Sequence, residues 1–275
     1  MNIGIIGQGF VGNAIFQKFR HFYNVLTYDL QSKLCNSILN EIYTSCQYIF
    51  ICLPTPMNND GSCYIKIVED ELSKLNTYCQ NKQQEKVVII KSTITPGTTS
   101  KWNKKFSNLT IVFNPEFLTE ANAVKDYENQ NRIILGGPRK GTTPLKPVFS
   151  KVFPKAKIIK TDSTHAEMVK YTINCFLATK VSFANEIYQI CNGLDIDYDK
   201  VIEYAVYDDR LGYSHWAVPG PDGDFGYGGP KDVKALKSLA WDIGCQPRML
   251  EATDSKNNDI RTNRDWENMT GRAII

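Results

Sequence analysis

The sequence has no paired cysteines. Its eight cysteines are scattered, without a CxxC or other paired spacing, at Cys35, Cys46, Cys52, Cys63, Cys79, Cys175, Cys191 and Cys245. This pattern argues against a disulfide scaffold and against a zinc site, so we expect no metal. Free thiols are typical of proteins in a reducing compartment, and we expect a cytoplasmic protein.

The sequence also lacks a long apolar run and a strong excess of either charge. No stretch approaches the roughly 18 apolar residues of a membrane span, and residues 1–7 do not resemble a secretory signal. The net charge of +3 is small for 275 residues, and no cluster of Lys and Arg is interleaved with aromatics. We therefore expect neither a membrane nor a nucleic acid as a partner.

A glycine-rich turn is the first motif that is present. Residues 1–7 form a short apolar pattern, GQGFVG follows at residues 7–12, and a helix is predicted to about residue 22. Gly7 permits a tight turn, Gly9 lets a pyrophosphate approach the backbone, and Gly12 allows close packing of helix on strand. The next strand ends in Asp29, which would accept from ribose hydroxyls and repel a 2'-phosphate. The spacing predicts a dinucleotide site that prefers NAD to NADP.

Apolar runs continue to alternate with helical patterns through the first half of the chain. We predict further strands at residues 47–53, 86–91, 109–113, 132–135 and 157–160. The alternation predicts an α/β fold, with a Rossmann-type, doubly wound parallel sheet over residues 1–162. Ligands lie at the carboxyl ends of the strands in such sheets, which places Thr93, Glu116 and Glu120 on the cofactor side.

Residues 162–193 predict one long connecting helix. Neither Pro nor Gly interrupts residues 162–190, and Gly193 ends the pattern. About 28 helical residues span roughly 42 Å, a length typical of a helix that crosses a domain boundary or forms the spine of a dimer. Lys170 and Asn174, four residues apart, project from one face of it. Helical patterns resume at residues 198–207 and 231–243, so residues 163–275 predict the connecting helix and a small all-α second domain.

Together these motifs resemble the UDP-glucose/GDP-mannose dehydrogenase family. The matching segments are CLPTP at residues 52–56, KSTITPGT at 91–98, NPEFLTE at 114–120, AEMVKYTIN at 166–174 and GYGGPKD at 226–232, besides the glycine turn. Several motifs in the right order are far more specific than a fold alone. The resemblance covers roughly residues 1–260. It implies an NAD-dependent oxidoreductase of polysaccharide biosynthesis, a homodimer that oxidises C6 of a nucleotide sugar such as UDP-glucose to a carboxylate.

The resemblance implies catalytic roles for five residues. Thr93 would position a water or the reacting hydroxyl, and Glu120 would serve the later hydrolytic step together with Glu116. Lys170 and Asn174 would bind and polarise the reacting oxygens, as hydride removal from an alcohol requires. Asp232 would help Lys170 and a water in proton transfer.

Binding residues follow from the same resemblance, and Arg210 would reach the substrate of a neighbouring subunit. The implied substrate-binding residues are Glu116, Phe117, Leu118, Arg210 and Gly228. The implied cofactor-binding residues are Gly7, Gly9, Phe10, Val11, Gly12, Asp29, Pro54, Thr55, Thr93 and Glu120.

Two departures from the family pattern bear on activity. The family's second oxidation passes through a cysteine in a Gly-Gly-x-Cys-x-Pro-Lys-Asp loop, whereas here Gly229 is followed directly by Pro230. Cys245 is the nearest candidate to replace it, but it follows a predicted helix. Family members also carry a further nucleotide-binding domain, which the 275 residues do not include, so we expect weak or redirected binding of the nucleotide. These departures predict at most one hydride transfer, which leaves an aldehyde.

Two other interpretations remain open. One is a two-electron dehydrogenase of the β-hydroxyacid type, which shares the Rossmann-plus-helical layout and a helical Lys with an Asn four residues on, and needs no cysteine. The other is a non-catalytic NAD-binding module whose motifs serve folding and dimerisation.

Overall fold

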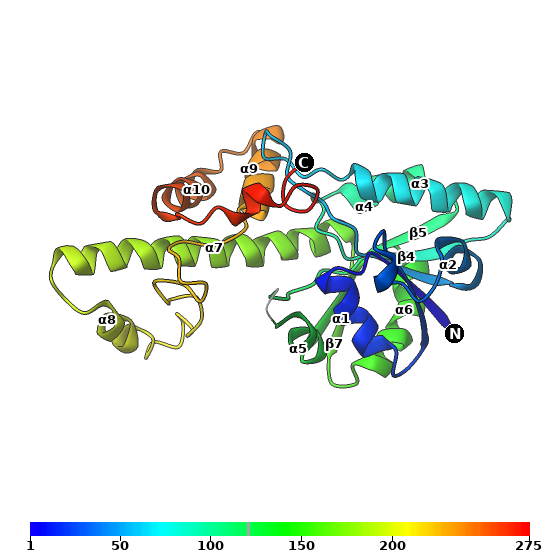
Figure 1. Cartoon of the computed structure of the whole chain (residues 1–275), viewed down its shortest axis with the longest axis horizontal. Helices are drawn as coiled ribbons and strands as arrows, with labels where there is room; N and C mark the ends of the chain where they lie inside the picture. The colour runs from blue at the N-terminus through cyan, green and yellow to red at the C-terminus, as the bar shows by residue number, and fades with distance from the viewer. Residues whose placement is uncertain (120–121) are drawn as a thin grey trace. The chain divides into compact units, whose positions relative to one another are not determined.

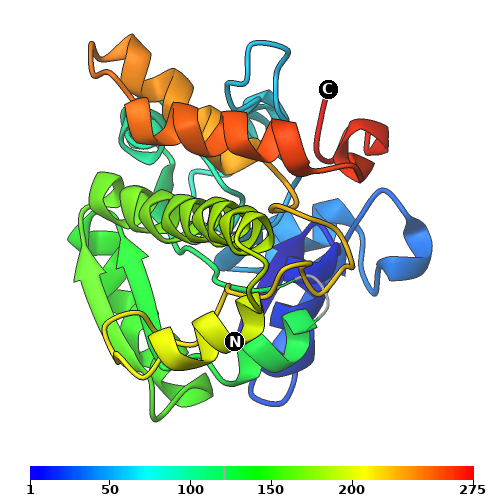
Figure 2. The same cartoon turned by 90° about the vertical axis from the view of Figure 1, so that its left-hand side faces the viewer.

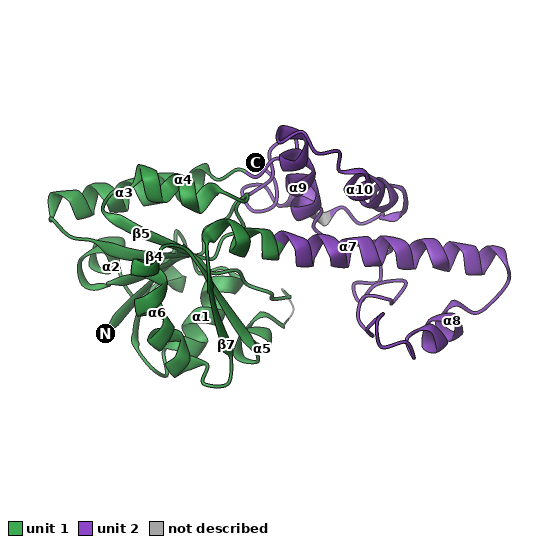
Figure 3. Ribbon diagram, turned by 180° about the vertical axis from the view of Figure 1, so that it is seen from behind, with its two compact units in different colours: residues 1–55, 64–170 green, residues 56–63, 171–275 purple. Residues whose placement is uncertain are grey.

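The computed structural model describes residues 1–119 and 122–275, so the predicted site residue Glu120 lies outside the described residues. Two compact units are present (Figure 3). Unit 1 comprises residues 1–55 and 64–170, and unit 2 comprises residues 56–63 and 171–275. The domain boundary predicted after residue 162 stays a prediction, although the two units meet within the predicted long helix.

Unit 1 is built on one seven-stranded sheet with the order β2-β1-β3-β4-β5-β6-β7. Its strands are β1 (Asn2–Ile6), β2 (Asn24–Tyr28), β3 (Tyr48–Ile51), β4 (Lys86–Ile90), β5 (Leu109–Phe113), β6 (Arg132–Gly136) and β7 (Lys157–Thr161). Neighbouring strands are parallel except β5 and β6, which pair antiparallel through Phe113 and Gly136. The predicted α/β fold and strands are confirmed, with one reversal of direction at β6.

Helices cover both faces of this sheet (Figure 1). They are α1 (Phe10–Phe19), α2 (Leu39–Ser45), α3 (Lys66–Asn81), α4 (Thr98–Lys105), α5 (Ala123–Glu128) and α6 (Arg139–Val152), with a short 3-10 turn, η1 (Ser32–Leu34). Core residues of α2, α3 and α4 share one cluster, and those of α1, α5 and α6 share the other. Within β3, Ile49 and Ile51 belong to the first cluster and Phe50 to the second, because side chains alternate across a strand. The sheet is therefore doubly wound.

Helix α7 (Ser163–Gly193) begins in unit 1, and a buried carboxylate fixes its first turns there. The Glu167 side chain is fully buried and accepts from the backbone N–H groups of Gly97 at 2.6 Å and Thr99 at 2.9 Å. These N–H groups open α4 and have no partner within that helix. This contact therefore joins the PGT segment after β4 to the AEMVK segment of α7.

Unit 2 consists of helices around the remainder of α7 (Figure 2). They are α8 (Tyr198–Ala205), α9 (Lys231–Asp242) and α10 (Arg248–Ile260), followed by a 3-10 turn, η3 (Asp265–Asn268). In Figures 1 and 2, α9 and α10 lie on one side of α7 and α8 on the other. Residues 56–63 belong to this unit, where Met57 forms a bridge with Ile274. Among the described residues, no helix combines the length and apolarity needed to cross a membrane.

Removal of the Glu167 carboxylate should destabilise the protein. In Glu167→Ala, the buried N–H of Thr99 and the half-buried N–H of Gly97 lose their acceptor, and we expect the free energy of unfolding to fall by about 2–4 kcal/mol. Urea denaturation followed by circular dichroism measures this. Glu186→Ala on the same helix is the matched control, because its side chain is 58% exposed, and it should change stability by less than about 0.5 kcal/mol. Equal losses in both variants would contradict this account of the contact.

Candidate active site

The glycine turn has the geometry that the sequence predicted. Gly7 adopts a φ of +96°, which disfavours other residues, and a Cβ there would lie 2.5 Å from the Cys52 carbonyl oxygen. A Cβ on Gly12 would lie 1.9 Å from the Gly7 carbonyl oxygen. A Cβ on Gly9 would meet no atom within 4 Å, so open space lies above that residue. The turn therefore leaves the N-terminus of α1 accessible, as a bound pyrophosphate requires.

The Asp29 carboxylate follows β2 and is held by backbone donors. Gln8 N–H donates to its Oδ2 at 2.7 Å, and Gln31 N–H donates to its Oδ1 at 2.9 Å. The first bond ties the carboxylate to the glycine turn. Each oxygen keeps a further lone pair, which a ribose hydroxyl can use.

A cavity of about 580 Å³ lies beside the glycine turn and the loop after β2. Gly9 and Phe10, two of the implied cofactor residues, line it, and so do Lys33, Cys35 and Asn36, for which the sequence predicted no role. The Asn36 side chain accepts from Thr27 N–H at 2.7 Å and donates to the Val25 carbonyl at 2.9 Å. This side chain thereby pairs with the exposed edge of β2 and holds the loop as a wall of the cavity.

The remaining implied cofactor residues of unit 1 lie near the carboxyl ends of β1, β3 and β4. The Thr55 hydroxyl is buried and donates to the Thr93 carbonyl at 2.7 Å, which ties the two loops together. Pro54 is exposed, and Val11 is half-buried in the first turn of α1. The loops predicted to meet a dinucleotide therefore share one edge of the sheet.

A buried ion pair joins the loop after β5 to α7. Lys170 Nζ donates to Glu116 Oε1 and to the Glu116 carbonyl, each at 2.7 Å, and both residues are less than 9% exposed. Leu118 N–H donates to Glu116 Oε2 at 2.9 Å. Burial alone would raise the pKa of Glu116, but the Lys170 ammonium and these hydrogen bonds outweigh burial and hold it below the usual value.

The Phe117 ring lies beside two cations. The Arg132 guanidinium is 4.5 Å from the ring centroid and Lys170 Nζ is 5.9 Å from it. The ring face attracts both charges. Four of the residues implied by the resemblance, Glu116, Phe117, Leu118 and Lys170, are thus gathered in unit 1.

In unit 2, Asn174 and Asp232 are hydrogen-bonded. Asn174 Nδ2 donates to Asp232 Oδ2 at 2.6 Å, and Asp232 lies in the first turn of α9. A carboxylate is favourable in this position because the N-terminus of a helix carries partial positive charge. The bond leaves the Asn174 side-chain oxygen available to a ligand.

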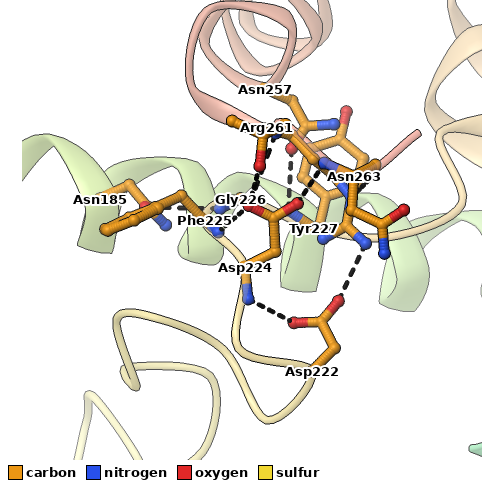
Figure 4. Close-up of polar contacts among 10 residues, drawn as sticks. Asn185, Asp222, Asp224, Phe225, Gly226, Tyr227, Asn257, Arg261 and Asn263 are labelled. Atoms are coloured by element: carbon orange, nitrogen blue, oxygen red, sulfur yellow. Dashed lines mark hydrogen bonds and ion pairs between the residues drawn. The ribbon is translucent and has the colours of Figure 1, made fainter. Parts of the chain in front are cut away.

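The segment that contains Gly228 is held on two sides (Figure 4). Asn185 of α7 accepts from Gly226 N–H at 3.4 Å, and Asn257 of α10 accepts from Tyr227 N–H at 2.8 Å. A Cβ on Gly228 would lie 3.4 Å from Arg261 Nη2, so the backbone passes close to that guanidinium. Sequence reasoning missed Asn257 and Arg261.

Arg210 is not gathered with the other implied residues of unit 2. Its side chain is 87% exposed and pairs locally with Asp208, at 2.5 Å. Cys245 is exposed and follows the C-terminal end of α9, whereas Asp232 lies in the first turn of that helix. Among the described residues, no group of His, Cys, Asp or Glu side chains is arranged to hold a metal ion.

The fold and the glycine turn, with Asp29 and the adjoining cavity, define a dinucleotide-binding dehydrogenase. The chain belongs to the UDP-glucose/GDP-mannose dehydrogenase family: the model of the family's NAD binding domain matches residues 25–155, and that of its central domain matches residues 164–259. The family resemblance and the prediction of NAD as cofactor are confirmed.

Individual relatives agree with this membership. The chain is 28% identical to the UDP-glucose 6-dehydrogenase AglM of Haloferax volcanii, over 94% of this chain and 70% of that protein. It is 32% identical to the UDP-glucose 6-dehydrogenase TuaD of Bacillus subtilis, over 86% of this chain and 51% of that protein. The solved UDP-glucose dehydrogenase of Pyrobaculum islandicum matches with a TM-score of 0.84 at 25% identity, over 94% of this chain and 68% of that one. The chain thus spans about half to two thirds of the length of such relatives.

Two alanine substitutions in the glycine turn should have different effects. Gly9→Ala places a methyl group in open space, so stability should change by less than about 0.5 kcal/mol, while NAD affinity falls at least about tenfold because the methyl obstructs the pyrophosphate. Gly12→Ala, whose Cβ would overlap the Gly7 carbonyl, should lower the melting temperature as well. Calorimetric NAD titration and thermal unfolding separate these effects. Unchanged NAD affinity in Gly9→Ala would place the cofactor elsewhere.

Proposed function

We propose that this chain is an NAD-dependent dehydrogenase that oxidises the C6 hydroxyl of a nucleotide sugar, with UDP-glucose as the first candidate. The observation that carries the proposal is the buried Lys170–Glu116 pair, which lies in the same unit as the cofactor cavity. An ammonium that is less than 9% exposed, with an adjacent carboxylate, suits the binding and polarisation of a reacting oxygen.

The chemistry follows from the side chains. Bound NAD would accept the hydride, so that the alcohol becomes an aldehyde, and the hydroxyl proton would pass to a water, the acceptor that the family resemblance implies. Lys170 stabilises the negative charge that develops on this oxygen, and Glu116 holds the ammonium by two hydrogen bonds. The Asn174 amide donates to Asp232, and both residues keep the roles that the family resemblance implies. Thr93, Glu120 and Arg210 keep the roles that the family resemblance implies.

The segment after Gly228 limits the proposed reaction to one hydride. Oxidation of an aldehyde to a carboxylate through the family's route needs a thiolate that forms a covalent adduct with the carbon. Here Gly229 precedes Pro230, and Cys245, the next cysteine in the sequence, follows the far end of α9. Burial raises the pKa of Cys175, near Asp232, to about 12, so it remains a neutral thiol at neutral pH.

The number of NADH molecules formed per sugar tests the proposal. With UDP-glucose in limiting amount, the protein should release no more than one equivalent of NADH. Insertion of an x-Cys-x segment between Gly229 and Pro230 should raise this to two equivalents and produce uronate. The same insertion with Ser in place of Cys is the matched control and should remain at one. Two equivalents from the unmodified chain would show that the missing thiol does not limit it.

The substrate panel for this measurement should include small 3-hydroxy acids. Turnover of such an acid, without turnover of nucleotide sugars, would favour the β-hydroxyacid interpretation. NAD binding without turnover of either class would favour the binding-only interpretation.

We also propose a homodimer formed through α7. Phe176, Phe183 and Ile190 are spaced by seven residues, so they lie on one stripe of the helix, and they are 64%, 52% and 51% exposed. An exposed apolar stripe of this kind suits packing against a second copy. The exposed Arg210 is compatible with its implied reach into a neighbouring subunit.

Substitution of the stripe should produce monomers. The double variant Phe176→Ser/Phe183→Ser should sediment as a monomer at micromolar concentration, where the unmodified chain sediments as a dimer, because two apolar contacts per copy are lost. Met249→Ser on α10, also exposed at 68%, is the matched control and should remain dimeric. A monomeric unmodified chain would refute the proposal.

We place the protein in the cytoplasm. All eight cysteines are free, and four of them are buried. Free thiols persist in a reducing compartment.

A further inference from the structure

Lys91, the first residue of the KST segment, is buried beside the candidate site. It is 3% exposed, and its Nζ donates to Asn114 Oδ1 at 2.9 Å and to the Pro115 carbonyl at 3.4 Å. Asn114 in turn donates from its side chain to the Ile134 carbonyl at 2.7 Å. These bonds fix the backbone immediately before Glu116.

Two ammonium groups therefore act on consecutive peptide carbonyls. Lys91 contacts the carbonyl of Pro115, and Lys170 contacts that of Glu116. Among the described side chains that contact Lys91 or Lys170, Glu116 is the one buried carboxylate. The two protonated lysines therefore carry one positive charge more than this carboxylate neutralises. A buried excess of positive charge stabilises negative charge on a nearby oxygen, because the low dielectric screens it weakly.

We propose that Lys91 is a positioning residue of the reaction, which holds the Glu116 segment against Lys170 and supplies the second positive charge of the site. The proposal rests on the function proposed above. Lys91 acts in two ways. Its hydrogen bonds to Asn114 and Pro115 position Glu116, and its positive charge acts electrostatically on the reacting oxygen. In its protonated form it favours the developing negative charge on the reacting oxygen, and in its neutral form it does not.

Lys91 is expected to lose its proton within the working pH range. Burial is the largest influence on the pKa of Lys91, and together with the like charge of Lys170 it brings this pKa down to about 8. The Glu116 carboxylate acts in the opposite direction, whereas the neighbouring Cys52 keeps its proton in this range because burial raises the pKa of its thiol to about 12. Tyr127 presents its ring to Lys91, with Nζ 5.6 Å from the centroid, and burial raises the pKa of this phenol, so it stays neutral.

The pH profile of single-turnover hydride transfer tests the proposal, with Lys91→Met and Lys91→Arg. In the unmodified chain the rate should fall above about pH 8 by about tenfold in total, to the level of the uncharged variant. Lys91→Met, which keeps the shape but not the charge, should be about tenfold slower at pH 7 and show no such fall. Lys91→Arg, whose guanidinium stays charged, should restore the rate at pH 7 and remove the fall. An unchanged profile in both variants, or a fall retained in Lys91→Arg, would overturn the proposal.

A second measurement does not depend on turnover. Folded Lys91 releases its proton near pH 8 and unfolded Lys91 near the ordinary 10.5, so the unfolded chain binds more protons between these values. The free energy of unfolding of the unmodified chain should therefore rise relative to that of Lys91→Met as the pH increases from 8 to 10. A flat difference would overturn the proposal even if the enzyme is active. A rising difference without turnover of any nucleotide sugar would support a titrating Lys91 and refute the proposed function instead.

Discussion

The Lys170–Glu116 pair is the interaction on which the candidate site depends. Taking two charges out of water costs several kcal/mol per ion, and the pair recovers this only with good geometry and additional hydrogen bonds. Here both 2.7 Å contacts to Glu116 and the Leu118 N–H bond supply them. Loss of one partner would leave the other charge buried alone. The pair thus fixes the loop after β5 against the first turns of α7 more strictly than apolar packing would.

The strands could be predicted from the sequence because buried parallel strands are continuous apolar runs bounded by polar loops. Their direction could not, since the run in β6 has the same pattern whether it pairs parallel or antiparallel. Helix α10 was missed for a related reason. Its buried residues are Thr253, Asp254 and Asn257, so the buried face is polar and gives no apolar period. The partners of these polar groups come from distant segments, which local patterns do not report.

The candidate site could be predicted in part. Spacing placed Lys170 and Asn174 on one helix face, but it did not indicate that each would be held by a different carboxylate, Glu116 and Asp232. The cavity wall formed by residues 33–36 was not predicted either. The Asn36 side chain holds this loop by hydrogen bonds to the backbone of β2, in the place of a neighbouring strand. A single polar residue in a loop does not indicate such a contact in the sequence. Motif spacing and the family resemblance therefore suggest candidate residues, whereas tertiary contacts determine the partners of those residues.

The segment around Gly229 is held by contacts on both sides. Gly226 and Tyr227 are bonded to α7 and α10, and α9 begins directly at Lys231 with Asp232 in its first turn. Gly229 itself takes a φ of +70°, which suits glycine and lets the chain turn straight into the helix. On the proposed function, the second oxidation is then lost through a local change in one connection. A three-residue segment inserted between Gly229 and Pro230 would extend from a backbone that is held on both sides. The insertion therefore requires no rearrangement of α7, α9 or α10.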